Sequence, residues 1–233
     1  MSPPEITMSI STLNPMASPQ VGAFLKRMMD VFGAAFALLV LAPVFLAVAA
    51  LIKISDPAGP VFYKQNRVGR AGRAIGVLKF RSMKWQYSTG PNRPYQTAAE
   101  AFQAMGRPDL CAEFELEQKV ADDPRVSGLG RFLRKSSLDE LPQLVNALRG
   151  ELSLVGPRPI ITPELERYGK QGATYLSVKP GITGLWQVSG RSGTGYDDRV
   201  RLDVQYVNNW KLALDLAILV KTVRTVLVRE GAY

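Results

Sequence analysis

The sequence contains no histidine and a single cysteine, Cys111, among its 233 residues. The missing histidine excludes nucleophiles activated by an imidazole and metal sites with imidazole ligands. One cysteine excludes both an intramolecular disulfide framework and a zinc site built from thiolates. A bound metal must therefore take its ligands from carboxylates and phosphate oxygens, which favours Mg²⁺, with Mn²⁺ as the alternative.

Acidic residues are fewer than basic ones, 20 against 29, and the formal net charge is +9. Because no histidine contributes, this charge changes little near neutral pH. The excess favours anionic partners such as phosphate-rich ligands, acidic lipid headgroups or nucleic acid. The length allows one substantial domain with an anchoring element and argues against a second complete domain.

One apolar run has the length of a membrane segment: residues 28–52, whose only charged residue is Asp30. A straight helix of that size would be about 37 Å long, and a bilayer hydrocarbon core is about 30 Å thick. Pro43 lies near the centre of the run, where it removes a helix hydrogen bond and clashes with the preceding turn. The sequence therefore predicts a bend at Pro43.

Basic residues flank this run on both sides, with Lys26 and Arg27 before it and Lys53 after it. Positive charge is typical of segments that stay in the cytoplasm. We therefore expect a re-entrant helix–break–helix over residues 23–54 that enters one leaflet and returns. A spanning helix with a proline kink is the alternative.

The rest of the chain is predicted to be an α/β unit, mostly α. Strands are expected at 61–63 and 75–83, on either side of a Gly-rich hairpin loop at 67–73. The predicted organisation is a disordered tail, the anchor, a cytoplasmic catalytic domain and a variable insertion within that domain: 1–22, 23–54, 55–233 and 85–118.

Two later segments are typical of basic amphipathic helices. Residues 128–149 are expected to be helical in two pieces, and 210–228 has an apolar stripe beside Lys221 and Arg224. Such helices suit the surface of an anionic membrane, which favours a monotopic protein. A solvated charged face over an ordinary core is the alternative for each helix.

The segment that carries the most chemistry is residues 134–144. Ser137 and Glu140 have the spacing of a capping box, which would place Asp139 in a first helical turn, where the helix dipole keeps a carboxylate ionised. An ionised aspartate can attack phosphorus, a neighbouring glutamate can hold a divalent cation, and Arg134 can contact the same phosphates. The pattern also fits an ordinary helix cap.

Further on, Arg158 stands between Pro157 and Pro159, which stiffen its backbone and suit it to phosphate recognition. A plain surface turn is the alternative. Trp186 follows in a Gly-rich stretch and is either a core residue or a platform for a base or lipid.

Together these segments resemble the bacterial sugar transferase family, the monotopic phosphoglycosyl transferases that start exopolysaccharide and O-antigen assembly. The resemblance runs from Lys26 to Tyr233 apart from the insertion. It rests on the Lys-Arg-x-x-Asp start of the anchor and on five further motifs: Lys79-Phe80-Arg81-Ser82-Met83, Ser137-Leu138-Asp139-Glu140-Leu141-Pro142-Gln143, Gly156-Pro157-Arg158-Pro159, Lys179-Pro180-Gly181-Ile182-Thr183-Gly184 and Leu202-Asp203-Val204-Gln205-Tyr206-Val207.

The resemblance implies a re-entrant hairpin, a small catalytic domain with interfacial amphipathic helices, and a Mg²⁺-dependent reaction in two steps. Asp139 would attack the sugar-bearing phosphorus of a UDP-sugar, release UMP and carry a phosphosugar that undecaprenyl phosphate then accepts. Glu140 would hold the metal. Substrate-binding roles fall to the residues matched by motif: Lys79, Arg81, Arg134, Arg158, Gln187 and Asp203.

The same resemblance implies a monotopic protein at the cytoplasmic face of the bacterial inner membrane, in contact with anionic lipid and not with nucleic acid. It favours galactose over glucose as the sugar and leaves a homodimer open. One departure lies at the bend, where the family often has Ser-Pro and this chain has Ala42-Pro43.

Two other classes compete with this interpretation. A tethered, non-catalytic protein that binds polyanions fits the charge and the anchor, but the paired carboxylates would repel a polyanion unless a metal intervened. A soluble-type glycosyltransferase would normally need a larger nucleotide-binding fold than the roughly 180 residues that follow the anchor.

Overall fold

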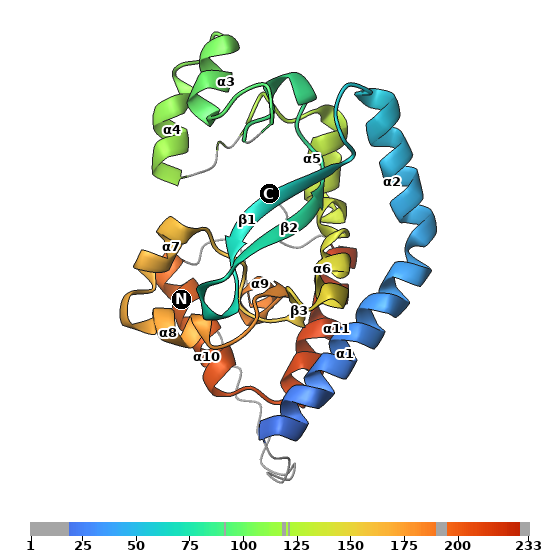
Figure 1. The fold of residues 1–233 in the computed structure, drawn as a ribbon, viewed down its shortest axis with the longest axis vertical. Coiled ribbons are helices and arrows are strands. Elements are labelled where there is room, and N and C mark those ends of the chain that lie inside the picture. Colours follow the sequence, from blue (N-terminus) through green and yellow to red (C-terminus); the bar gives the residue numbers. More distant parts are fainter. Residues whose placement is uncertain (1–18, 91, 118–119, 121, 190–194, 229–233) are drawn as a thin grey trace.

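Two helices joined at a bend form the anchor, which runs along one side of the molecule (Figure 1). In the computed structural model, α1 spans Pro19–Val40 and α2 spans Ala42–Ser55, and the two are bent by 64°. Pro43 lies in the first turn of α2, so the predicted bend is confirmed. Within the described residues no single helix is long and apolar enough to cross a membrane, although this bent pair is by length and composition.

The structure describes residues 19–90, 92–117, 120, 122–189 and 195–228. Most of the predicted tail, residues 1–18, lies outside them. The remainder of that predicted tail, residues 19–22, is helical and belongs to α1, which starts four residues before the predicted start of the anchor.

The central strands form an antiparallel hairpin, as predicted. β1 spans Phe62–Val68 and β2 spans Ala74–Phe80, with Tyr63 opposite Lys79. β1 is longer than the predicted 61–63, because the expected loop contributes its first two residues to the strand. The turn itself is short, and Gly72 takes a positive φ of 76° there.

The remaining elements are mostly short helices, which confirms a mostly α member of the α/β class. In chain order they are η1 (Arg70–Gly72), η2 (Trp85–Tyr87), α3 (Ala98–Ala104), α4 (Leu110–Glu117), α5 (Gly128–Lys135), η3 (Leu138–Glu140), α6 (Gln143–Arg149), β3 (Ser153–Val155), α7 (Thr162–Arg167), η4 (Gly169–Gln171), α8 (Gly172–Leu176), β4 (Gly181–Thr183), α9 (Leu185–Val188), α10 (Tyr196–Asn208) and α11 (Leu212–Val228). β3 and β4 pair in parallel as a second small sheet.

Both halves of the anchor pack against the rest of the chain. Ala34 of α1 shares a buried cluster with residues of α6, β3, α10 and α11. Gly33 lets α1 come close, since a Cβ there would lie 2.6 Å from Leu154 Cδ1. Val48 and Ile52 of α2 form a second cluster with one residue each of β2 and α5. The anchor is therefore part of the core on its inner side.

The outer side of the anchor and of α11 is apolar. Large apolar side chains exposed there are Val21, Phe24, Leu25, Phe32, Phe36, Leu39, Val40, Val44, Leu46, Leu51, Ile54, Leu216, Val220 and Val223. Water disfavours so much exposed apolar surface, whereas lipid does not. Leu216 and Val223 of the predicted stripe on 210–228 thus point outward, while Asp215 and Ile218 form the buried face of α11.

Helix α5 also differs from the prediction. Leu129, Phe132 and Leu133 lie on the apolar side of the first piece of the basic amphipathic segment 128–149. Leu133 is fully buried and Leu129 packs beside it, but Phe132 is 53 % exposed. Phe132 therefore adds an apolar side chain to the surface of this basic helix.

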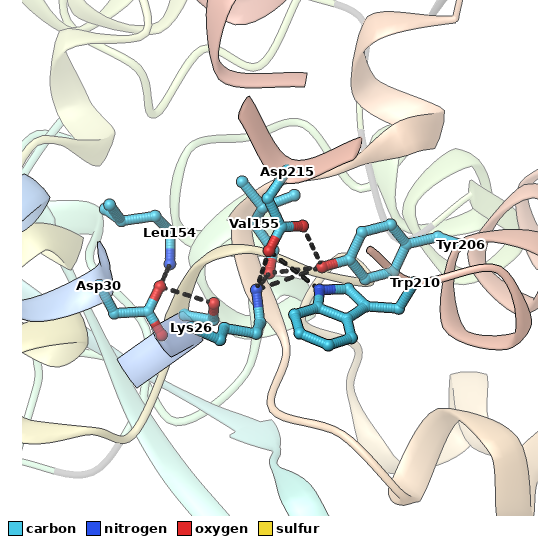
Figure 2. A network of polar contacts seen from close by, with 8 residues as sticks. Lys26, Asp30, Leu154, Val155, Tyr206, Trp210 and Asp215 are labelled. Carbon is cyan, nitrogen blue, oxygen red and sulfur yellow. Dashed lines mark hydrogen bonds and ion pairs between the residues drawn. The ribbon is translucent and has the colours of Figure 1, made fainter. Parts of the chain in front are cut away.

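A buried polar network fastens the start of α1 to the carboxyl-terminal helices (Figure 2). Lys26 Nζ donates to Asp215 Oδ2 at 2.8 Å and to the Val155 carbonyl at 3.0 Å. Asp215 is fully buried and also accepts from the Tyr206 hydroxyl at 2.7 Å and from Trp210 Nε1 at 3.0 Å. Three donors thus meet one carboxylate.

The other two charged residues at the start of the anchor have partners as well. Arg27 donates to the carbonyls of Ala147 and Leu148 at the end of α6, both at 2.7 Å. Asp30 accepts from Ser153 Oγ and the Leu154 amide. Lys26 and Arg27, which flank the apolar run in the sequence, therefore make contacts within the domain. That both ends of the anchor face the cytoplasm stays a prediction.

The described residues of the insertion, 85–90 and 92–117, form a small helical unit, with α3 and α4 at the upper left of Figure 1. Phe102 of α3 and Leu110 of α4 are buried together with Val120. The guanidinium of Arg125 lies 4.3 Å from the centre of the Phe102 ring and forms a buried ion pair with Asp123. The unit thus has a small core of its own.

Candidate active site

Asp139 and Glu140 lie in η3, a short 3₁₀ turn between α5 and α6. The predicted capping box is wrong: Ser137 has a left-handed conformation with φ 56°, and its side chain makes no capping hydrogen bond. The residue that does cap a helix here is Ser127, whose hydroxyl accepts from the Gly130 amide at the start of α5. The two carboxylates therefore occupy a tight link between helices, and α6 starts only at Gln143.

The Asp139 side chain is buried, with 8 % of the residue exposed. Burial raises the pKa of Asp139 to about 6, and the neighbouring Glu140 adds to this effect, while Lys79 and Arg134 oppose it. The sequence predicted a carboxylate kept ionised by a helix dipole, whereas the structure places Asp139 in a buried turn that raises its pKa. A carboxyl group with a pKa near 6 is still mostly ionised at pH 7.

Two cations lie beside the carboxylates. Lys79 of β2 donates to Glu140 Oε1 at 2.8 Å. Arg134 of α5 acts electrostatically on Asp139 and donates from Nε to Ser82 Oγ at 2.9 Å. Gly130 allows this approach of α5, since a Cβ there would lie 1.8 Å from the Ser82 carbonyl oxygen.

The carboxylates of this site decide which kind of metal site it could form. Among the described residues no group of three or more His, Cys, Asp or Glu side chains could hold an ion. Mg²⁺ commonly binds through one or two carboxylates, with substrate phosphates and water completing its shell. The adjacent carboxylates of Asp139 and Glu140 fit that pattern, so the residues present suit a Mg²⁺ ion that binds together with a diphosphate. Glu140 as its ligand stays a prediction.

Arg81 lies apart from this group. Its side chain is buried and donates from Nη2 to the Asp56 carbonyl at the end of the anchor. Asp56 also accepts from the Trp85 amide at 2.7 Å through its carboxylate. Arg81 thus ties the end of α2 to the domain, and its predicted contact with phosphate gains no support from this placement.

Three more of the predicted residues gather in a second group around α9 and α10. Asp203 accepts from the Tyr168 hydroxyl at 2.7 Å, and the positive charges of Arg158 and Arg199 act on its carboxylate. The Arg158 guanidinium lies 5.9 Å from the centre of the Trp186 ring, and Gln187 beside it is buried. The predicted substrate-binding residues therefore fall into two groups, and Arg81 belongs to neither.

Sequence reasoning missed the other members of this second group. Arg67 of β1 and Arg199 of α10 both pair with Glu164, at 3.4 and 3.1 Å. Arg199 also lies 5.2 Å from the Trp186 ring centre, and its Nε and Nη2 have no partner among the described residues. Arg67 and Arg199 thus meet at Glu164, while Arg158 and Arg199 lie near Trp186.

The β hairpin links the two groups. Tyr63 is the partner of Lys79, and Arg67 follows four residues later on β1, about 13 Å along the strand. A diphosphate with a nucleoside attached has dimensions of that order. No local spacing in the sequence relates Arg67 to Arg199, so only the fold could reveal the second group.

Asp203 gives the second group a measurable dependence on pH. Burial raises its pKa to about 6, and the hydrogen bond from Tyr168 opposes the shift. Between the unfolded pKa, about 4, and the folded one, the folded protein binds more protons than the unfolded chain, so stability falls as pH rises.

We expect Asp203→Asn to remove this dependence. Relative to that variant, the wild-type protein should lose roughly 2–3 kcal/mol of unfolding free energy between pH 4 and pH 7. Unfolding of both proteins at pH 4, 5, 6 and 7 measures the difference. Parallel profiles would show that Asp203 titrates normally.

A family match and individual relatives both identify proteins that this chain resembles. Residues 21–229 match the family described as "Bacterial sugar transferase". The chain is 45 % identical over 213 residues to the "Exopolysaccharide production protein ExoY" of Rhizobium meliloti (strain 1021), which covers 91 % of this chain and 90 % of that protein.

Two longer relatives are named for their reactions. Over 212 residues the chain is 45 % identical to the "Undecaprenyl-phosphate galactose phosphotransferase" of Salmonella typhimurium, covering 90 % of this chain and 42 % of that protein. Over 221 residues it is 36 % identical to the "UDP-glucose:undecaprenyl-phosphate glucose-1-phosphate transferase" of Escherichia coli (strain K12), covering 91 % and 42 %.

Proposed function

Because the chain belongs to the bacterial sugar transferase family, it is a phosphoglycosyl transferase, and we propose that it moves a hexose 1-phosphate from a UDP-sugar onto undecaprenyl phosphate. UMP is the other product, and the lipid-linked sugar starts an exopolysaccharide or a related glycoconjugate. The observation that carries the proposal is the buried Asp139 carboxylate, next to Glu140 and flanked by two cations.

The first step is attack by a carboxylate oxygen of Asp139 on the phosphorus that bears the sugar. The bond between that phosphorus and the bridging oxygen breaks, and UMP leaves with the electron pair. Burial shields Asp139 from water, while its pKa of about 6 leaves it ionised at neutral pH. Lys79 and Arg134 place positive charge where negative charge develops.

The second step returns the enzyme to its starting state. A phosphate oxygen of undecaprenyl phosphate attacks the same phosphorus and displaces Asp139, which regains its carboxylate. The product is an undecaprenyl diphosphate sugar. A Mg²⁺ ion held by Glu140 would neutralise phosphate charge and polarise the phosphorus–oxygen bonds in both steps.

The second group of residues is proposed to hold the nucleotide part of the donor. Arg67, Arg158 and Arg199 supply positive charge for a phosphate, and Trp186 offers a flat apolar face. The hairpin joins this group to Lys79, so one donor can reach from the arginines to Asp139.

We also propose a monotopic protein at the cytoplasmic face of the inner membrane, in contact with anionic lipid. Support comes from the outward apolar side of the anchor and α11. Both ends of the anchor are fastened to one domain, through Lys26 at its start and Asp56 at its end. A domain on one side of the membrane can hold both ends only if the anchor turns back.

Labelling of introduced cysteines tests this topology. Starting from Cys111→Ala, Gln20→Cys and Ala58→Cys place one thiol before and one after the anchor. Both should resist an impermeant maleimide in spheroplasts and react after permeabilisation. Reaction of Gln20→Cys alone in intact spheroplasts would establish a spanning helix instead.

A donor panel tests the reaction itself. The purified protein in vesicles with undecaprenyl phosphate and Mg²⁺ is supplied with UDP-galactose, UDP-glucose and UDP-N-acetyl sugars. UMP release that depends on the lipid acceptor is expected with a UDP-hexose, and the resemblance favours galactose. Release of UDP in place of UMP would indicate transfer of the sugar without its phosphate and would contradict the proposal.

A further inference from the structure

Asn146 is a buried side chain whose amide joins α6 to β2. Only 1 % of the residue is exposed. Its Nδ2 donates to the Gly76 carbonyl at 2.9 Å, and its Oδ1 accepts from the Leu78 amide at 2.9 Å. Nδ2 donates in addition to Glu151 Oε2. Both functional atoms of the amide are thus engaged.

The two bonds to β2 lie on the edge of the strand that β1 leaves uncovered. Among the described residues β2 pairs with β1 alone in a two-stranded sheet, so no strand bonds the backbone groups of its other edge. The carbonyl of one residue and the amide two residues later face the same edge, and these are the groups that a further strand would bond. Asn146 supplies one donor and one acceptor to the carbonyl of Gly76 and the amide of Leu78, and so replaces that strand locally.

Both elements that Asn146 joins, β2 and α6, are close in sequence to residues of the candidate active site. On β2, Lys79 directly follows Leu78 and reaches Glu140 Oε1 at 2.8 Å. On the other side, α6 begins three residues after Glu140, the last residue of the η3 turn that also contains Asp139. The Asn146 amide therefore connects β2, which carries Lys79, to α6, the helix that follows Asp139 and Glu140.

We propose that Asn146 is a positioning residue for phosphosugar transfer: its amide holds β2 against α6, so that the Lys79 ammonium stays beside Asp139 and Glu140. The inference rests on the proposed function for its effect on turnover. Asn146 itself makes no contact with Asp139, Glu140 or the Lys79 side chain among its hydrogen bonds, so it acts through the position of Lys79.

A double-mutant cycle tests this route. Asn146→Leu keeps the approximate volume and removes the hydrogen bonds, while Lys79→Met removes the cation. In the wild-type background Asn146→Leu should lower kcat for UMP release about tenfold, with KM changed less than about twofold. In the Lys79→Met background the same change should lower kcat by less than about twofold, because the group it positions is already gone.

Two further variants distinguish the proposed effect on Lys79 from a general loss of folding. Asn146→Ser is a milder change that should give a smaller loss of kcat with the same dependence on Lys79. Glu151→Gln keeps a hydrogen-bond acceptor for Asn146 and should leave kcat within about twofold of the wild type. Equal loss of kcat on substitution of Asn146 in both backgrounds would mean a purely structural role and would overturn the proposal.

A readout without turnover separates this inference from the proposed function. The melting temperatures of Lys79→Met, Glu140→Gln and the double variant give a coupling, which is the departure of the double variant from the sum of the single changes. This coupling reports the ion pair between Lys79 and Glu140. That coupling should be present in the wild-type background and absent in Asn146→Leu. An unchanged coupling would contradict the role of Asn146 even if the enzyme turns over, and absent UMP release by the wild type would contradict only the proposed function.

Discussion

Asp139→Asn is expected to lower the rate of UMP release by about 1,000-fold or more. The amide has nearly the same shape as the carboxylate, so it fits the same buried site, but it carries no negative charge and is a poor nucleophile toward phosphorus. The measurement is UMP formed per enzyme from UDP-sugar, Mg²⁺ and undecaprenyl phosphate in vesicles.

The matched control for this change is Asp109→Asn. Asp109 is exposed in the insertion, where it pairs with Arg107 on the surface. The same chemical change there should leave UMP release within about twofold of the wild type. If Asp139→Asn also kept a tenth or more of wild-type turnover, Asp139 could not be the nucleophile.

Asp215→Asn is expected to lower the free energy of unfolding by about 3–5 kcal/mol. Asp215 is fully buried and is the partner of Lys26, Tyr206 and Trp210. Neutralising it leaves the Lys26 ammonium without its ion-pair partner and puts an amide N–H group among three donors. Thermal unfolding in detergent micelles, compared with wild type, measures the loss.

Asp198→Asn is the control for that effect. Asp198 lies on the neighbouring helix α10 and forms an exposed pair with Arg201 at 3.2 Å. Exposed pairs of this kind contribute little, so the variant should differ from wild type by less than about 0.5 kcal/mol. Similar losses in both variants would mean that the network around Lys26 does not fasten the anchor.

The features that the sequence predicted correctly depend on neighbours along the chain. Pro43 bends the anchor because the missing amide and the ring act on the turn immediately before it. The strands β1 and β2 follow from two short apolar stretches on either side of a Gly-rich turn. Such local effects hold whatever surrounds them.

Sequence reasoning fell short where distant segments decide the outcome. It did not identify the buried partner of Lys26, because Asp215 lies 189 residues away in sequence. The Ser137–Glu140 spacing matched a capping box, yet the link between α5 and α6 is too tight for a regular first turn, and Ser137 adopts a left-handed conformation. In the same way, burial outweighs the cations in the pKa of Asp139.

The candidate site was predictable in its parts but not in its arrangement. The resemblance assigned roles to Lys79, Arg134 and Arg158 alike, whereas the fold sets the first two beside Asp139 and the third beside Trp186. No sequence pattern distinguishes Asn146, because an asparagine in a short helix has no characteristic neighbours. Its importance follows only from the strand edge that it meets.

The covalent link between Asp139 and the phosphosugar is the central claim, and intact mass spectrometry tests it most directly. Enzyme treated with the UDP-sugar that it uses and Mg²⁺, without lipid acceptor, should gain the mass of one hexose phosphate. Proteolysis should place that mass on the peptide that contains Asp139, and undecaprenyl phosphate should remove it. An enzyme that releases UMP with acceptor but never carries this mass, or carries it equally in Asp139→Asn, would contradict the account.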